Sequence, residues 1–217
     1  MNKRFILLGD YATSNVGFTL ASCSLSPAVY RSVREAVPAM DGAADCSELL
    51  TGTVQYESRT LTAILELSEK NRAYRRTVID HLINAFDGKT ELITLPDTPN
   101  LYLKGRIHIE QQYNDMAHAA VKVTAVCDPW HYAKQETVYT LTNAIGVQNV
   151  AIRNQGRKTV CPLFSSDGDC TVTVGRVTHE IHSGSRRFDD IVFQNGSTMI
   201  SHSGSGMLRI TFREGWL

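Results

Sequence analysis

Three groups that could do chemistry together lie at the end of a strand pattern: the thiol of Cys127, the carboxylate of Asp128 and the imidazole of His131. A thiol becomes a nucleophile when an imidazole lies within hydrogen-bond reach of it, so a cysteine-dependent enzyme is one interpretation. The alternation of the strand instead places Cys127 on the same apolar face as Val123 and Ala125. We therefore interpret Cys127 as a core side chain.

A second candidate is the segment His179-Glu180-Ile181-His182, which could supply two imidazole ligands to a metal ion. Residues three apart on a strand point to opposite faces of the sheet. The spacing also differs from H-E-x-x-H, which places both imidazoles on one side of a helix. We interpret these residues as ordinary strand or loop histidines.

The acidic residues Asp41, Asp45 and Glu48 could bind calcium, but they lack the D-x-D-x-D-G spacing of a calcium loop. A solvated turn is the alternative that we favour. Five glycines also fail to match a phosphate-binding fingerprint, which needs a strand, a glycine-rich turn and a helix start in that order: Gly9, Gly17, Gly184, Gly204 and Gly206. We predict no catalytic, cofactor-binding or metal-binding residues.

The cysteines argue for reduced thiols, because there are five of them and no two have CxxC spacing. They are Cys23, Cys46, Cys127, Cys161 and Cys170. Charge is balanced, with 22 basic and 22 acidic residues in a chain of 217. Residues 1–132 carry 13 basic and 15 acidic side chains, and residues 133–217 carry nine and seven. Neither half has the basic excess that nucleic-acid binding requires.

Two further patterns bear on location. There is no 18-residue apolar run, so we expect no membrane span. The apolar stretch within Met1–Asp10 is too short for a signal peptide, so we expect synthesis in a cytoplasm.

Hydrophobic periodicity predicts a mainly β chain with one helix. A helix is expected from Glu69 to Phe86, capped by Ser68 and closed by Gly88. Its apolar face should carry Tyr74, Val78, Leu82, Ala85 and Phe86, and its polar side Lys70, Arg72, Arg75, Arg76 and Asp80. We therefore expect Leu82 to be buried and Arg75 to be exposed.

The other predicted elements of the first half are strands. Alternating side chains predict a long hairpin from residues 102–110 and 119–127, with a turn at Tyr113–Asp115. Shorter strands are expected at Arg4–Leu8, Leu20–Leu25, Val29–Ala36, Thr53–Tyr56, Thr60–Leu67 and Glu91–Leu95.

A second domain, residues 133–217, is predicted as an all-β sandwich because short strands recur between turn signals. Its expected strands are Thr137–Leu141, Gln148–Ile152, Thr159–Phe164, Asp169–Val174, Arg176–Ile181, Phe188–Phe193, Thr198–Ser201 and Met207–Arg213. The polar segment Ala133–Glu136 separates this domain from residues 1–132.

Three features together resemble the N-terminal domain of the distal tail proteins of long-tailed (siphovirus-type) bacteriophages. The first is the turn Val37-Pro38-Ala39-Met40-Asp41-Gly42, close to the family's Val-Pro-Gly-x-Asp-Gly but with Ala39 where glycine is usual. The second is the single helix between strand Thr60–Leu67 and the hairpin. The third is the aromatic-rich junction Cys127-Asp128-Pro129-Trp130-His131-Tyr132. These features cover residues 1–132.

The resemblance implies a structural virion protein without enzymatic activity or cofactor. Residues 1–132 would form a hexameric ring around the tail channel, and residues 133–217 a galectin-like sandwich. The implied partners are other copies of the chain, the tail tube protein, the tail-tip hub or fibre protein, and receptor-binding proteins. The implied location is the tail tip of the virion, after assembly in the host cytoplasm.

The alternative function is a carbohydrate-binding module used in host adhesion. Sugar rings stack on aromatic side chains, but those of the second domain mostly lie on faces that are expected to be core: Tyr139, Phe164, Phe188, Phe193, Phe212 and Trp216. Trp130 and Trp216 lie near domain ends and could pack at a domain junction or contact a partner.

Overall fold

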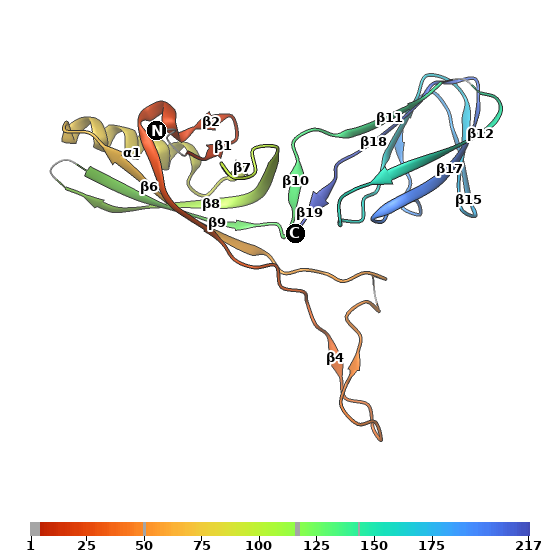
Figure 1. The fold of residues 1–217 in the computed structure, drawn as a ribbon, viewed down its shortest axis with the longest axis horizontal. Coiled ribbons are helices and arrows are strands. Elements are labelled where there is room, and N and C mark those ends of the chain that lie inside the picture. The colour runs from red at the N-terminus through yellow and green to blue at the C-terminus, as the bar shows by residue number, and fades with distance from the viewer. Residues whose placement is uncertain (1–4, 50, 116–117, 143) are drawn as a thin grey trace. The chain divides into compact units, whose positions relative to one another are not determined.

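The computed structural model describes residues 5–49, 51–115, 118–142 and 144–217. The chain is mainly β with one α-helix, which confirms the predicted fold class (Figure 1). It divides into two compact units, Met1–His131 and Tyr132–Leu217. Among the described residues, no helix has the length and apolar character needed to cross a membrane.

The first unit is built on an antiparallel sheet with the strand order β2-β1-β7-β8-β9-β6-β3. Its strands are β1 (Leu7–Leu8), β2 (Tyr11–Ala12), β3 (Phe18–Leu25), β6 (Arg59–Ser68), β7 (Thr90–Thr94), β8 (Leu101–Asn114) and β9 (His118–Cys127). A 3-10 helix, Thr13–Val16, joins β2 to β3. The predicted hairpin is confirmed as β8–β9, although β8 continues to Asn114 and the expected turn at Tyr113–Asp115 begins too early. Residues 116–117 lie outside the described residues, as does Arg4 of the expected first strand.

Helix α1 (Arg72–Phe86) packs on one face of this sheet. Val78, Ile79 and Leu82 are buried against strand residues such as Ile107 and Val123. The cap is Asn71, not the predicted Ser68, because the Asn71 side chain accepts hydrogen bonds from the backbone N–H groups of Ala73 and Tyr74. Gly88 follows the helix with a φ of 75°, as a residue just past a helix end commonly does.

The predicted helix face was wrong at two positions. Tyr74, expected in the core, is 46% exposed, and Arg75, expected in solvent, is fully buried. The Arg75 guanidinium donates hydrogen bonds to the backbone carbonyls of Glu69 and Asp115 and to the side-chain oxygen of Asn114. These acceptors lie before the helix and at the end of β8, so tertiary contacts, which periodicity does not encode, decide where Arg75 lies.

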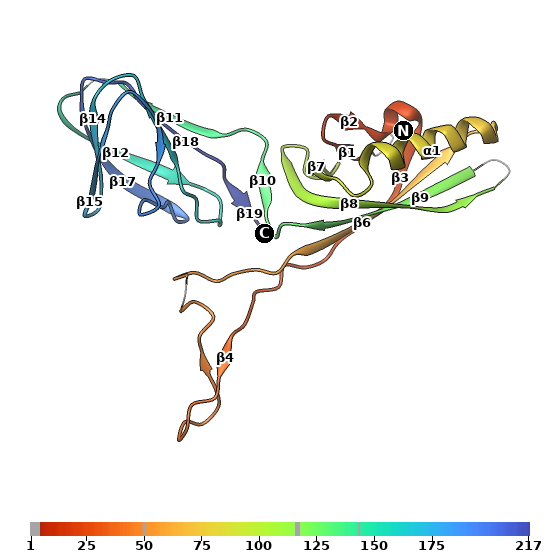
Figure 2. The same cartoon turned by 180° about the vertical axis from the view of Figure 1, so that it is seen from behind.

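The second unit is a sandwich of two sheets that share one apolar core. One sheet has the order β11-β18-β13-β16 and the other β12-β17-β14-β15. Figure 2 labels β11 and β18 of the first sheet and all four strands of the second. Their bounds are β11 (Thr137–Leu141), β12 (Ala144–Asn154), β13 (Leu163–Ser166), β14 (Cys170–Val174), β15 (Val177–Ile181), β16 (Gly184–Arg187), β17 (Gly196–Gly204) and β18 (Leu208–Phe212). Two short strands, β10 (His131–Ala133) and β19 (Gly215–Trp216), pair with each other.

Two predicted strands of the sandwich depart from the structure. Thr159–Phe164 begins too early, because β13 starts at Leu163. Phe188–Phe193 forms no strand beyond a single bridge between Val160 and Phe193, although Ile191 and Phe193 are buried in the core. The polar segment Gly184–Arg187 forms edge strand β16 instead, with all four residues exposed. The apolar residues of Phe188–Phe193 correctly indicated burial but not strand formation. The polar segment could form a strand because an edge strand pairs with a neighbour on one side only.

Candidate assembly interface

Between β3 and β6 the chain leaves the sheet as a long two-stranded excursion, residues 26–58, here called the arm. Figures 1 and 2 both show it as an orange ribbon that extends away from the helix-covered part of the sheet. Two short strands, β4 (Arg34–Glu35) and β5 (Ala44–Asp45), pair within it, and Tyr30 and Tyr56 form an isolated antiparallel bridge nearer its base. The predicted strands Val29–Ala36 and Thr53–Tyr56 are therefore wrong as continuous strands.

The arm has no core of its own, because none of its described residues is buried. It nevertheless carries large apolar side chains at exposed positions. They are Val29 (54% exposed), Tyr30 (54%), Val33 (43%), Val37 (44%), Met40 (51%) and Leu49 (79%). Exposed apolar side chains gathered on one segment mark an interaction surface more often than a solvated loop.

The tip of the arm is shaped by the predicted Pro38 turn. The backbone N–H of Met40 donates to the carbonyl of Val37 at 3.2 Å, and Ala39 has a φ of 64°. This left-handed conformation favours glycine, since a Cβ atom makes it costly by about 1 kcal/mol. Ala39 stands where the distal tail pattern has glycine, so the departure noted in the sequence falls at the one described residue other than glycine that has a positive φ.

The base of the arm is fixed to the first unit by a buried arginine. Arg59 is 8% exposed, and its Nε donates to the carbonyl of Ser26 at 2.8 Å. A second guanidinium nitrogen reaches the carbonyl of Pro129 at 3.5 Å. Burial lowers the pKa of Arg59. Beside it, the rings of Tyr56 and Trp130 meet edge to face with centroids 5.3 Å apart.

This arrangement gives the junction motif a structural role that the sequence did not reveal. Pro129 contacts Arg59 and Trp130 contacts Tyr56, so both stabilise the point where the arm leaves the sheet. The interpretation of Trp130 as either a domain-junction or a partner contact missed this third role. The arm is therefore exposed along its length but anchored at its root.

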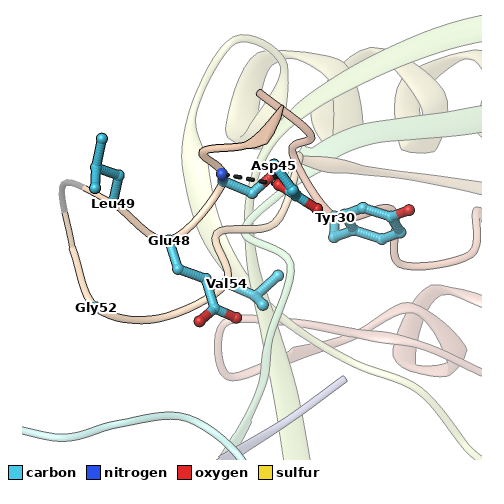
Figure 3. Close-up of a pocket in the computed structure, with 7 residues that line it drawn as sticks. Tyr30, Asp45, Glu48, Leu49, Gly52 and Val54 are labelled. Carbon is cyan, nitrogen blue, oxygen red and sulfur yellow. Dashed lines mark hydrogen bonds between the residues drawn. The ribbon is translucent and has the colours of Figure 1, made fainter. Parts of the chain in front are cut away.

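Part of the arm is hollowed into an open pocket of about 580 Å³. Its lining combines an aromatic ring, aliphatic groups and two carboxylates: Tyr30, Asp45, Ser47, Glu48, Leu49, Gly52 and Val54 (Figure 3). The Asp45 carboxylate accepts hydrogen bonds from the backbone N–H and hydroxyl of Ser47, which lower its pKa. The Glu48 carboxylate has no partner among the described residues.

The thiol, carboxylate and imidazole near residue 127 do not form a nucleophilic site. Cys127 is 1% exposed on the core face of β9, as its position in the alternation predicted. It fits there because the facing residue is Gly105, where a Cβ atom would approach the Cys127 sulfur to 2.5 Å. Burial and the Asp128 carboxylate raise the pKa of the Cys127 thiol to about 11, which disfavours the reactive thiolate. Burial, with a smaller contribution from Arg59, lowers the pKa of His131.

The two histidines of the His179-Glu180-Ile181-His182 segment have separate partners. His179 contacts the Asp190 carboxylate at 2.9 Å and stacks on Phe188, whereas His182 contacts Asp169 at 2.8 Å. Within the part of the chain that the structure describes, no three His, Cys, Asp or Glu side chains converge as metal ligands.

The aromatic side chains of the sandwich mostly serve its core. Phe164, Phe193 and Phe212 are buried, as predicted. A shallow hollow of about 400 Å³ lies on the sheet that contains β15, and residues such as Asp169, Glu180 and His182 line it. None of its described lining residues is a Trp, Tyr or Phe on which a sugar ring could stack.

Comparison with known proteins gives a match at the level of the fold. No protein-family model matches the chain, and no curated protein matches it. Among solved structures, it resembles SPP1 Dit (gp 19.1), described as a paradigm of the hub adsorption apparatus in phages that infect Gram-positive bacteria. The TM-score is 0.71 at 14% identity, over 97% of this chain and 98% of that one. The chain has the Dit fold. The resemblance inferred from the junction motif, the single helix and the turn is thereby confirmed as a likeness of fold.

Proposed function

We propose that the protein is a structural subunit of a phage tail tip that assembles with other copies into a ring, with six copies as the expected number. The ring would join the tail tube to a hub or fibre protein. The observation that carries this proposal is the arm, seen on a chain whose fold matches SPP1 Dit over almost its full length. We propose no catalytic role and no cofactor.

The physical argument concerns the free energy of ordering the arm. Fixing a residue's backbone costs about 1–2 kcal/mol, and a two-stranded ribbon alone offsets that poorly. None of the described arm residues is buried within its own chain, so contact with a partner would supply the missing burial. A closed ring requires two different complementary surfaces on each subunit, and an arm that reaches onto a neighbour provides one of them.

The other face of the main sheet suits the lining of a channel. Opposite helix α1, β6 and β8 present Thr60, Glu66, Lys104 and Glu110 to solvent. Arg106 and Lys122 lie on the same face, so its charged side chains are of both signs, three basic and two acidic. The balanced composition of residues 1–132 agrees with this role.

The second unit would lie outside the ring-forming part and carry or contact adhesion components. The 86-residue unit Tyr132–Leu217 has its own core, so we expect it to fold without the first. Its buried aromatic side chains give the carbohydrate-binding alternative little support.

The test is the mass and shape of the purified full-length chain. Light scattering coupled to gel filtration and negative-stain imaging should find closed rings. A variant in which Asn-Gly replaces residues 31–55 joins the bridged pair Tyr30 and Tyr56 by a two-residue hairpin and should remain a folded monomer. A wild-type chain that is monomeric at all concentrations, or rings formed equally well without the arm, would overturn the proposal.

A further inference from the structure

Resting on the proposed ring, we infer that the pocket in the arm is a socket for an arginine side chain of a neighbouring copy, and that Arg72 at the start of helix α1 supplies it. The socket is defined by Tyr30, Asp45, Glu48, Leu49 and Val54.

The lining of the socket has the chemistry that recognises a guanidinium. The half-exposed ring of Tyr30 offers a face on which a planar cation can stack. Leu49 and Val54 offer apolar surface to the aliphatic stem of the side chain. The Glu48 carboxylate, without a partner among the described residues, can accept a pair of N–H groups.

Charge complementarity within the first unit points to a second copy as the partner. The arm carries five acidic residues, Glu35, Asp41, Asp45, Glu48 and Glu57, and two basic ones, Arg31 and Arg34. The remainder of residues 1–131 has one more basic than acidic side chain, since 11 of the 13 basic and ten of the 15 acidic residues lie outside the arm. The acidic excess of the arm favours its contact with a basic side chain of a neighbouring body.

We assign Arg72 as the occupant because the other described arginines of the body are buried or have partners. It is exposed, it has no partner among the described residues, and it is the first residue of α1. No acidic residue lies in the first turn of the helix. A cation there meets the positive end of the helix dipole, which is unfavourable. A carboxylate from a neighbouring arm would offset this repulsion. Docking would therefore relieve an unfavourable interaction between Arg72 and the helix dipole that the isolated subunit retains.

Charge reversal with rescue in the full-length chain tests the pairing. Sedimentation velocity over a concentration series would give the assembly midpoint of Glu48→Arg, Arg72→Glu and the double variant. Each single change should raise the midpoint by about tenfold or more, and the double variant should return to within about threefold of wild type. The matched control is Glu35→Arg, an exposed acidic residue of the arm outside the socket, which should shift the midpoint less than about threefold.

Misfolding would not imitate the expected result, because Arg72→Glu places an acidic group at the helix N-terminus and should stabilise α1. Assembly of Glu48→Arg at the wild-type midpoint would overturn the socket, as would a double variant no better than the single ones. If in that case the arm deletion still abolished rings, the proposed function would stand without the socket. A monomeric wild type would instead remove the proposed function.

Discussion

Helix α1 and the arm are both additions to the same sheet, yet one buries its apolar side chains and the other exposes them. Val78, Ile79 and Leu82 of the helix are at most 7% exposed, whereas Val33, Met40 and Leu49 of the arm are at least 43% exposed. The chain enters the arm after β3 ends at Leu25 and leaves it where β6 begins at Arg59. The helix is complete within a single chain, and the exposure of the arm fits the proposal that a second copy covers it.

The largest expected effect is at the helix. Leu82 is fully buried among sheet residues, so Leu82→Ala should lower the free energy of unfolding by about 2–5 kcal/mol through lost burial and the cavity left behind. Denaturant unfolding followed by circular dichroism measures this change. A loss below about 0.5 kcal/mol would mean that the helix face is not a closed core.

Arg75 extends the comparison to a polar group within the same core. Arg75→Ala should cost about 2–4 kcal/mol, because the carbonyls of Glu69 and Asp115 would lose their buried donor. The exposed neighbour Arg76 is the matched control, and Arg76→Ala should stay within about 0.5 kcal/mol. Equal small losses for both arginines would contradict the burial of Arg75.

His202 of the second unit is a buried polar group without such support. It is fully buried, and neither ring nitrogen makes a well-aligned hydrogen bond to a described residue. Burial lowers its pKa below the usual value, so the unfolded chain binds a proton more readily. Its neutral form therefore stabilises the fold above the unfolded pKa of about 6.5, and that stability is lost as the pH falls below it.

Thermal unfolding between pH 7.5 and pH 5.5 should accordingly show a falling Tm, and His202→Leu should weaken that dependence. The exposed His182→Leu is the control. The same pH slope in wild type and His202→Leu would mean that other groups set the acid sensitivity.

The smallest expected effect on stability is in the arm. Leu49→Ser removes a side chain that is 79% exposed, so the free energy of unfolding of the monomer should change by less than about 0.5 kcal/mol. The assembly midpoint should nevertheless rise, because that side chain would be buried against a partner. A stability loss comparable to that of Leu82→Ala would show that the arm folds onto its own chain, and the contrast between the two regions would disappear.

Much of the fold could be predicted because local patterns match it. The alternation over residues 102–110 and 119–127 follows the pleat of β8 and β9, and it also placed Cys127 in the core. The two-domain mainly-β class follows from the same repeated signals. The burial of Arg75 could not be predicted because it depends on acceptors before the helix and at the end of β8. The cap was a local error: Asn71 and Ser68 are both good capping residues, and the helix begins after the later one.

The candidate site could be predicted less well from the sequence than the fold. The arm contains β-branched and aromatic residues such as Val29, Tyr30 and Val33, which are typical of strands. In the structure these side chains are exposed. The Pro38 turn was predicted, and Ala39 marked a departure from the family pattern. The acidic residues Asp45 and Glu48 were considered as calcium ligands, and their place in a pocket with Tyr30 could be seen only in three dimensions.

Hydrogen–deuterium exchange of the arm, compared between monomer and assembled particles, tests the central claim most directly. The arm amides donated to partners across the ribbon, such as those of Arg31, Cys46 and Glu57, should become protected by about tenfold or more on assembly, because contact with a neighbour would suppress local opening. Helix α1 beyond its first turn should exchange equally in both states. Assembled particles whose arm amides exchange as fast as those of the monomer would contradict the account.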